Sequence, residues 1–276
     1  MDPTAPTDAD RVALMEQAYS SVEEVCSQLG DADWGRPTDL PGWSVKDNLS
    51  HLVSYEAIIS GRPRAPEDID ISAATHVTND FQALNEREVE WRRPRPGAEV
   101  LEEFREVTTA RIKDLAQMDD PSWEATMNSP FGPLPARDFM GIRLMDFFYH
   151  EQDIRRAAGK PGHLDGAVAR ACFERLATLS LPRVVGKAAA APDGTVVLFD
   201  VAPAGRPVAV AVQGGRGSLV EAPADPTVRI TCDLEAFFCL CGGRWQPAYA
   251  LADGRVRVQG DEQLGRRVLD ALSVIP

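Results

Sequence analysis

The segment LPGWSVKDNLSHLVSYE, residues 40–56, predicts where one helix begins and which of its faces is buried. Ser44 can act as the N-cap, and Asp47 stands three residues later, as in a capping box, where both satisfy backbone N–H groups. Apolar residues recur at helical spacing: Val45, Leu49, Leu52 and Ile59. We therefore expect a helix from Ser44 to about Ser60, with His51 at the edge of its apolar stripe.

The residues around this helix, up to about residue 160, also have helical periodicity. The further predicted helices cover residues 8–29, 72–93, 99–118 and 138–158. The segments GRPRAPEDID (61–70) and NSPFGPLPARD (128–138) are rich in Pro and Gly and are expected to be loops. The cluster GKPG at 159–162 indicates a domain boundary.

Beyond this cluster the pattern changes to strands. One helix is expected at 167–179, followed by strand-like runs TVVLFDV (195–201), PVAVAV (207–212), TVRITC (227–232) and RVRVQG (255–260). DLEAFFCLC (233–241) and residues 261–272 predict helices, and QGGRG (213–217) predicts a hairpin turn. We expect two domains, an all-α domain over residues 1–160 and an α+β domain over residues 161–276.

Composition disfavours several classes of partner. The chain has 276 residues and a net charge of −13, which disfavours binding to nucleic acid or to anionic membranes. It has no apolar run of the roughly 20 residues that span a bilayer. Residues 1–15 lack the basic start and apolar core of a signal peptide, so we expect none there. Five cysteines at irregular spacing indicate reduced thiols. We expect a cytoplasmic protein, either a monomer or a homodimer.

Histidines are scarce, and two of the four, His51 and His150, stand at informative positions. In DFFYH (146–150), Asp146 and His150 are four residues apart and share a helix face, so both can bind one metal ion. Together with His51 they make three ligands, which leaves one coordination position open, as in catalytic zinc sites. The spacing alone equally fits a structural polar contact of Asp146 with Arg143 or His150. Asp153, one turn further, can orient a ligand or pair with an arginine.

The same motifs resemble those of a known family. LPGWSVKDNLSHLVSYE and RLMDFFYHEQDIRRAAGKPGHLDG (143–166) resemble the metal-binding helices of the DinB-like fold in mycothiol-dependent maleylpyruvate isomerases. The segments 225–245 and 255–272 resemble the sterol-carrier-like domain that follows in this family. The resemblance implies a DinB-like antiparallel four-helix bundle followed by a sterol-carrier-like α+β domain. It places the metal ligands, for zinc or another divalent ion, on His51, Asp146 and His150.

The resemblance also implies a mechanism. A small-molecule thiol, mycothiol or a similar compound, is bound to zinc as thiolate and adds to an electrophilic small-molecule substrate, which is then isomerised or S-conjugated. The family usually has glutamate at position 146, so the shorter Asp146 puts the ligand set in question. Arg244, in GGRW (242–245), is the candidate to hold a substrate carboxylate from the second domain. Its alternative is a surface arginine after a glycine C-cap.

Several other residues have simpler interpretations. Arg143, Arg155 and Arg156 can bind an anion, although an Arg-Arg pair at a helix end is more typical of a solvated last turn. Trp43 is expected only to pack at the end of the bundle. His76 and His163 are expected to be solvated.

Two alternatives to an enzyme remain open from the sequence. One is a non-catalytic protein that binds a small molecule or lipid and has a structural metal. The other is a metal-free helical bundle that acts in regulation.

Overall fold

The computed structural model describes residues 6–129, 132–202 and 206–275, and the chain folds into two compact units. The first unit ends at Gly162 and the second begins at His163. The first is helical apart from one short hairpin, and the second combines helices with a five-stranded sheet. Among the described residues, no helix is long and apolar enough to cross a membrane.

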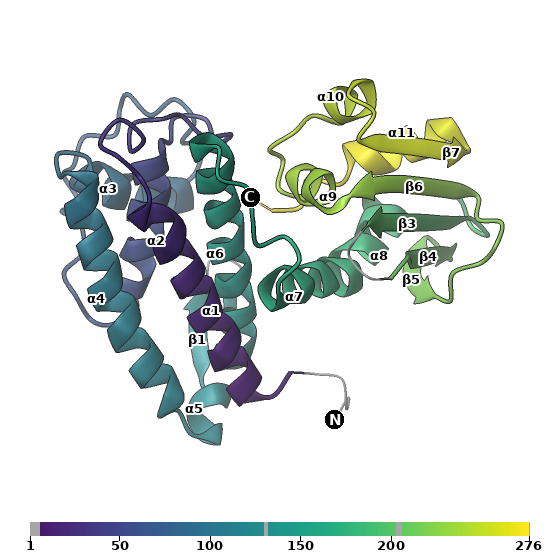
Figure 1. Ribbon diagram of the computed structural model, residues 1–276. Coiled ribbons are helices and arrows are strands. Elements are labelled where there is room, and N and C mark those ends of the chain that lie inside the picture. The colour runs from purple at the N-terminus through teal and green to yellow at the C-terminus, as the bar shows by residue number, and fades with distance from the viewer. Residues whose placement is uncertain (1–5, 130–131, 203–205, 276) are drawn as a thin grey trace. The chain divides into compact units, whose positions relative to one another are not determined.

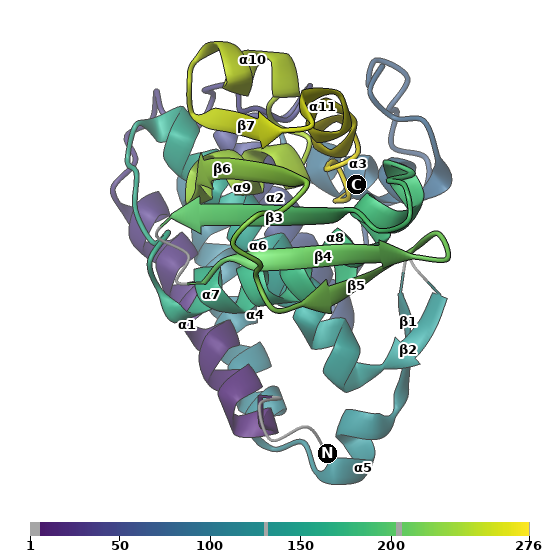
Figure 2. The ribbon, with the colours of Figure 1, turned by 90° about the vertical axis from the view of Figure 1, so that its right-hand side faces the viewer.

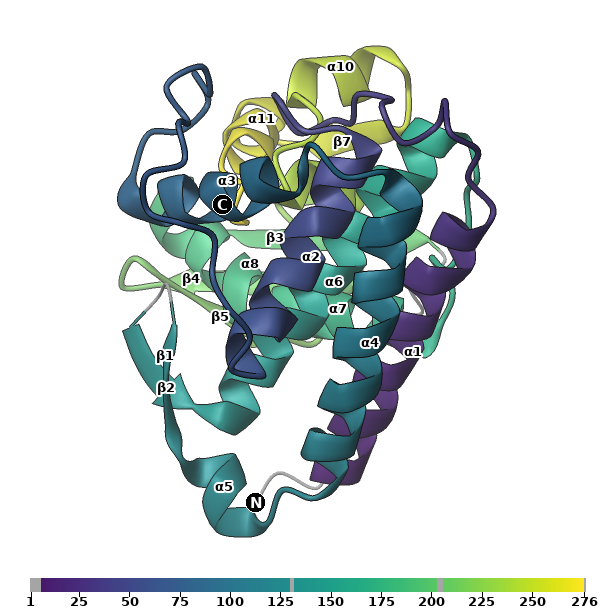
Figure 3. The same ribbon diagram turned by 90° about the vertical axis from the view of Figure 1, so that its left-hand side faces the viewer.

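Four long helices form the bundle of the first unit (Figure 1). They are α1 (Asp8–Ser27), α2 (Val45–Ile59), α4 (Gly97–Ala116) and α6 (Ala136–Ala158). Each of α1 and α2 packs against both α4 and α6. Figure 3 shows α1 and α4 side by side, running in opposite directions. Side chains of all four helices that are shielded completely from solvent fill the space between them: Val22, Val25, Leu49, Leu52, Phe104, Val107 and Phe147.

The helix ends follow from local sequence signals. Thr7 caps α1 and forms a capping box with Asp10, and Ser44 caps α2 in the same way with Asp47. At the other end of α6, Gly159 has φ of 66°, the left-handed conformation that glycine adopts at low cost. The predicted start of α2 at Ser44 is therefore confirmed, and His51 is a buried residue of this helix.

The short elements of this unit differ from the expectation. Helix α3 (Asp80–Arg92) begins only after its N-cap Asn79, whereas the sequence pattern predicted a start near residue 72. The Asn79 side chain accepts from the backbone of Gln82, and this cap sets the start. The expected loop around residues 128–138 contains a hairpin, β1 (Thr126–Ser129) and β2 (Gly132–Pro135), preceded by the short helix α5 (Asp120–Glu124). Residues 130 and 131 lie outside the described part.

The second unit is built on a sheet of order β5-β4-β3-β6-β7 (Figure 2). The strands are β3 (Val196–Ala202), β4 (Val208–Gln213), β5 (Arg216–Val220), β6 (Val228–Asp233) and β7 (Val256–Gly260). Only the β3–β6 pair is parallel. Gly214 and Gly215, with φ of 57° and 70°, form the predicted hairpin turn between β4 and β5. Strand β5 was not predicted, because its side chains are mostly exposed and carry little apolar signal.

The helices of this unit include one run with two wide turns. Helix α7 (Ala167–Arg175) continues through a π-helical turn (Leu176–Ser180), α8 (Leu181–Arg183) and a second π-helical turn (Val184–Ala188). The second π-helical turn packs closely on β5 through two glycines. A Cβ on Gly186 would lie only 2.2 Å from the backbone nitrogen of Gly217 in β5. The remaining helices are α9 (Leu234–Cys241), α10 (Pro247–Ala252) and α11 (Glu262–Asp270), of which α10 was not predicted.

Candidate metal centre

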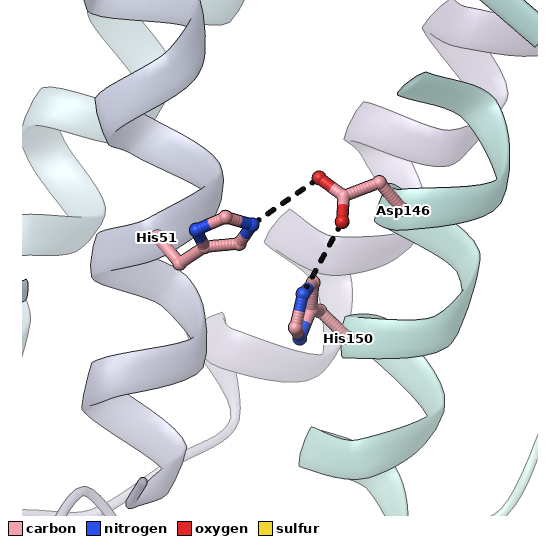
Figure 4. A group of neighbouring side chains, drawn as sticks. All are labelled: His51, Asp146 and His150. Atoms are coloured by element: carbon pink, nitrogen blue, oxygen red, sulfur yellow. Dashed lines mark ion pairs between the residues drawn. The ribbon is translucent and has the colours of Figure 1, made fainter. Parts of the chain in front are cut away.

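Helices α2 and α6 bring the three predicted ligands together inside the bundle (Figure 4). His51 Nε2 lies 3.3 Å from Asp146 Oδ2, and His150 Nε2 lies 3.3 Å from Asp146 Oδ1. The two imidazole rings meet edge to face, with centroids 4.7 Å apart. One ligand atom from each residue lies within 4.8 Å of the other two. No second cluster of His, Cys, Asp or Glu in the described ranges could hold a metal ion.

These separations fit a metal ion. Two nitrogen or oxygen ligands on a tetrahedral zinc, each bonded at about 2.0–2.1 Å, lie roughly 3.3 Å from each other. The side chain of Asp146 also reaches both imidazoles despite being one methylene shorter than glutamate. Each histidine thus lies at this separation from one Asp146 oxygen, and the three residues could hold one divalent cation.

Electrostatics favour the protonation states that metal binding requires. Burial lowers the pKa of His51, because it opposes the charged imidazolium more than Asp146 favours it. Burial opposes ionisation of Asp146, but the charges of His51 and Arg143 outweigh it, so its pKa falls well below its ordinary value. A neutral imidazole beside an ionised carboxylate is a pair that binds divalent cations.

The contact of Asp146 with Arg143, which the sequence offered as an alternative to metal binding, is also present. Arg143 donates to Asp146 Oδ2, and it also donates to Glu56 Oε1 through Nε at 3.1 Å and Nη2 at 3.0 Å. Glu56 is completely buried, and its other oxygen lies 3.3 Å from Arg111 Nε. Arg143 thus lies between two carboxylates and contacts the same Asp146 oxygen that faces His51. The Asp146 carboxylate therefore contacts both candidate histidine ligands and also forms an ion pair with Arg143.

His150 has two acceptors beside its other ring nitrogen. Asn48 Oδ1 lies 2.7 Å from Nδ1, and Asp153 Oδ2 lies 3.7 Å from it. Asp153 also pairs with Arg156, so it has the arginine partner that the sequence suggested. The sequence did not single out Asn48 as a partner of His150. The available signal was its place on α2 three residues before His51, on the same helix face.

Trp43 contacts both candidate histidine ligands, which the sequence did not predict. Its ring centroid lies 5.1 Å from that of His51 and 5.8 Å from that of His150. The indole N–H donates to the buried carboxylate of Glu86 at 2.8 Å. Packing at the bundle end is therefore only part of its role, because its indole forms one wall of the cluster.

His76 is not simply solvated, contrary to the expectation. Its Nε2 shares a 2.9 Å hydrogen bond with the same Glu86 carboxylate. Its ring packs on Gly42, where a Cβ would come within 2.6 Å of it, and Gly42 has φ of 80°. His76 thereby braces the turn that carries Trp43.

The arginines at the end of α6 are engaged by carboxylates. Arg155 is buried and pairs with Glu151, so the expected solvated last turn is wrong for this residue. Arg156 pairs with Asp39 and Asp153.

Arg244 lies in the second unit, directly after α9. Its Nη1 donates to the carbonyl oxygen of Gly242 at 2.6 Å, and Gly243, with φ of 66°, belongs to the turn that ends the helix. The glycine cap considered as the alternative is thus present. A role of Arg244 in holding a substrate carboxylate remains a prediction.

The five cysteines are buried free thiols. Burial raises the pKa of Cys26 and Cys241, and it raises the pKa of Cys232 to about 12. These three thiols are therefore protonated at neutral pH and are poor nucleophiles.

Two family models match the chain. The one described as mycothiol maleylpyruvate isomerase N-terminal domain matches residues 15–155, and the one described as SCP-2 sterol transfer family matches residues 173–273. The resemblance and the fold class predicted from the sequence are thereby confirmed: a DinB-like helical domain precedes a sterol-carrier-type α+β domain.

Solved structures agree at the level of fold. Two are crystal structures of the mycothiol-dependent maleylpyruvate isomerase, one of them of a histidine-to-alanine mutant. The mutant is 15% identical, and the alignment covers 92% of this chain and 93% of that one with a TM-score of 0.55. The other is 14% identical, with the same coverage and TM-score. No curated protein matches the sequence.

Proposed function

The chain belongs to the family named for the N-terminal domain of mycothiol maleylpyruvate isomerase, and on that premise we propose that it is a metal- and thiol-dependent enzyme. It isomerises or S-conjugates a small electrophilic substrate that bears a carboxylate. The observation that carries this proposal is the cluster of His51, Asp146 and His150, which offers three ligands to one ion. Zinc, or another divalent metal, and mycothiol or a similar thiol are the proposed cofactors.

Each residue of the cluster has a distinct part in this proposal. His51 and His150 bind as neutral imidazoles, and Asp146 supplies one negative charge. Arg143 holds the Asp146 carboxylate in place, and Trp43 packs against both rings. A zinc ion held there would lower the pKa of a bound thiol and so would supply a thiolate at neutral pH.

Access to the cluster supports catalysis over a sealed structural site. The Asp146 side chain keeps 25% of its surface exposed, whereas those of His51 and His150 keep 5% and 8%. An external thiol can therefore approach from the side of Asp146. The high pKa of the buried Cys26, Cys232 and Cys241 supports the use of an external thiol.

The reaction class follows from thiolate chemistry. In an isomerase, the thiolate adds to a conjugated double bond, the resulting single bond rotates, and the thiolate leaves again. In an S-transferase, the carbon–sulfur bond remains and the substrate carbon takes up a proton. Arg244 is proposed to bind the substrate carboxylate in either case. We further propose a cytoplasmic location and a monomer or homodimer, with no nucleic acid or membrane as partner.

A second candidate is a non-catalytic binder of a small molecule or lipid with a structural metal. It is favoured by the match of residues 173–273 to the SCP-2 sterol transfer family. The two candidates differ in the fourth coordination position, which is open to a thiol only in the enzyme.

Metal content and turnover test the proposal together. Purified wild type is expected to contain close to one equivalent of zinc or another divalent ion, and His51→Ala and His150→Ala far less. His163→Asn is the matched control, because His163 lies outside the cluster and asparagine tolerates its φ of 58°. A panel of electrophiles is then assayed with mycothiol, with glutathione and without thiol. Turnover that does not depend on thiol contradicts the mechanism, and metal binding without any turnover favours the binder.

A further inference from the structure

The carboxamide of Asn48 is held so that its oxygen faces His150. Asn48 is completely buried on α2. Its Nδ2 donates to the backbone carbonyl oxygen of Ser44 at 2.9 Å and to Thr38 Oγ1 at 3.1 Å. A carbonyl oxygen cannot donate a hydrogen bond, so the NH₂ group must lie on the Ser44 side and Oδ1 on the opposite side.

The hydroxyl group of Thr38 agrees with this orientation. It donates its single proton to the carbonyl oxygen of Trp43 at 2.9 Å and accepts from the backbone N–H of Leu40 at 3.3 Å. Towards Asn48 it can therefore only accept, which again requires Nδ2 on that side. The turn that carries Trp43 and the Asn48 side chain thus form one hydrogen-bonded unit.

The orientation of Asn48 determines the tautomer of His150. His150 Nδ1 lies 2.7 Å from Asn48 Oδ1, and an amide oxygen can only accept. Nδ1 therefore carries a proton. A ring whose Nε2 binds a metal ion is neutral and has its lone pair on that atom. Nε2 is the atom that faces Asp146 Oδ1 at 3.3 Å, where the metal ion would bind (Figure 4).

His51 differs in this respect. Its Nδ1 is buried and has no hydrogen-bond partner among the residues that the structure describes. The two histidines therefore differ at Nδ1. That of His150 has a buried amide oxygen as its hydrogen-bond partner, and that of His51 has no partner among the described residues.

We propose that Asn48 is a positioning residue that holds His150 as the Nδ1–H tautomer and so presents its Nε2 lone pair to the metal ion. This inference rests on the proposed metal-dependent function. Partners of this kind on metal-ligating histidines typically contribute about 10–100-fold to metal affinity.

The tautomer can be read in the metal-free protein, independently of function. Two-bond ¹H–¹⁵N correlation spectra of ¹⁵N-histidine-labelled protein at about pH 8 distinguish the two neutral tautomers. The chain has four histidines, and His150→Gln identifies the signals of His150. Wild type is expected to show the proton of His150 on Nδ1. This measurement needs no variant at position 48, so it stands even if such a variant folds poorly.

Variants then connect the tautomer to the metal. Asn48→Leu is expected to shift His150 towards the Nε2–H tautomer and to raise the zinc dissociation constant about 10–100-fold. Asn85→Leu, the same change at another buried position, is the control and should leave the tautomer unchanged.

A wild-type proton on Nε2, or a tautomer and zinc affinity unchanged in Asn48→Leu, would overturn the inference. Failure of the proposed function looks different: the wild-type tautomer is Nδ1–H, and thiol-dependent turnover is absent although zinc binds.

Discussion

Trp43 donates its indole N–H to the buried carboxylate of Glu86 at 2.8 Å. Trp43→Phe keeps an aromatic ring beside the histidines but removes this donor from Glu86. We expect a loss of about 1–3 kcal/mol in the free energy of unfolding, measured by urea denaturation, because a buried charged acceptor loses a partner. Trp91→Phe, at a position that is 38% exposed, is the control. Equal stability of the two variants would show that the hydrogen bond contributes nothing.

Asp146 is the ligand whose identity departs from the family pattern. Asp146→Asn removes the charge and is expected to weaken zinc binding at least tenfold in a competition assay with a chromophoric chelator. Asp146→Glu keeps the charge and is expected to change the affinity much less. Asp138→Asn, on the first turn of the same helix, serves as the control. If Asp146→Asn bound zinc as tightly as wild type, Asp146 would not be a ligand.

Glu56 supplies the negative charge that pairs with two buried arginines, Arg143 and Arg111. Glu56→Gln leaves Arg143 and Arg111 without this counter-charge, and removing one partner of a buried ion pair typically costs about 3–5 kcal/mol. Urea denaturation measures this loss. Glu106→Gln is the matched control, because Glu106 pairs with Arg62 at the surface, where such pairs contribute about 0–1 kcal/mol. A loss in Glu56→Gln as small as in the control would contradict the argument.

Glu103 predicts an acid-dependent loss of stability. Burial opposes its ionisation, but hydrogen bonds and charges from Arg92 and Arg95 lower its pKa below the ordinary value of 4.5. A carboxyl with a lowered folded-state pKa stabilises the fold above its unfolded pKa, and this contribution is lost as pH falls through the folded value.

The test of this prediction compares urea denaturation from pH 6 to pH 3. Glu103→Gln should be less stable than wild type at pH 6, with the difference shrinking as the pH falls below 4.5. Glu102→Gln, at an exposed neighbouring position, should follow the wild-type profile. A difference independent of pH would show that the charge of Glu103 is not involved.

Local signals in the sequence predicted much of the helical fold and the places of the three candidate ligands on their helices. The Ser44–Asp47 capping box set the phase of α2, and four-residue spacing placed Asp146 and His150 on one face of α6. Both signals are local, because they depend on helix geometry within a few residues.

Contacts between distant segments were not predictable from spacing. Asn48 meets His150 across 102 residues, and Arg143 meets Glu56 across 87, so neither contact has a sequence pattern. The start of α3 at Asp80 was misjudged because the cap at Asn79 prevailed over a weak helical pattern before it. Strand β5 escaped prediction because it lies at an edge of the sheet with its side chains mostly exposed.

Gly42 has a consequence for the recognition of relatives. Any other residue at this position would need a strained backbone at φ of 80° and would displace the His76 ring. That ring braces Glu86, which holds Trp43 against both candidate histidine ligands. A search for proteins with the same centre should therefore require glycine before the tryptophan as well as the two histidines. A library of substitutions at position 42 would alter the surroundings of the centre while every ligand is retained.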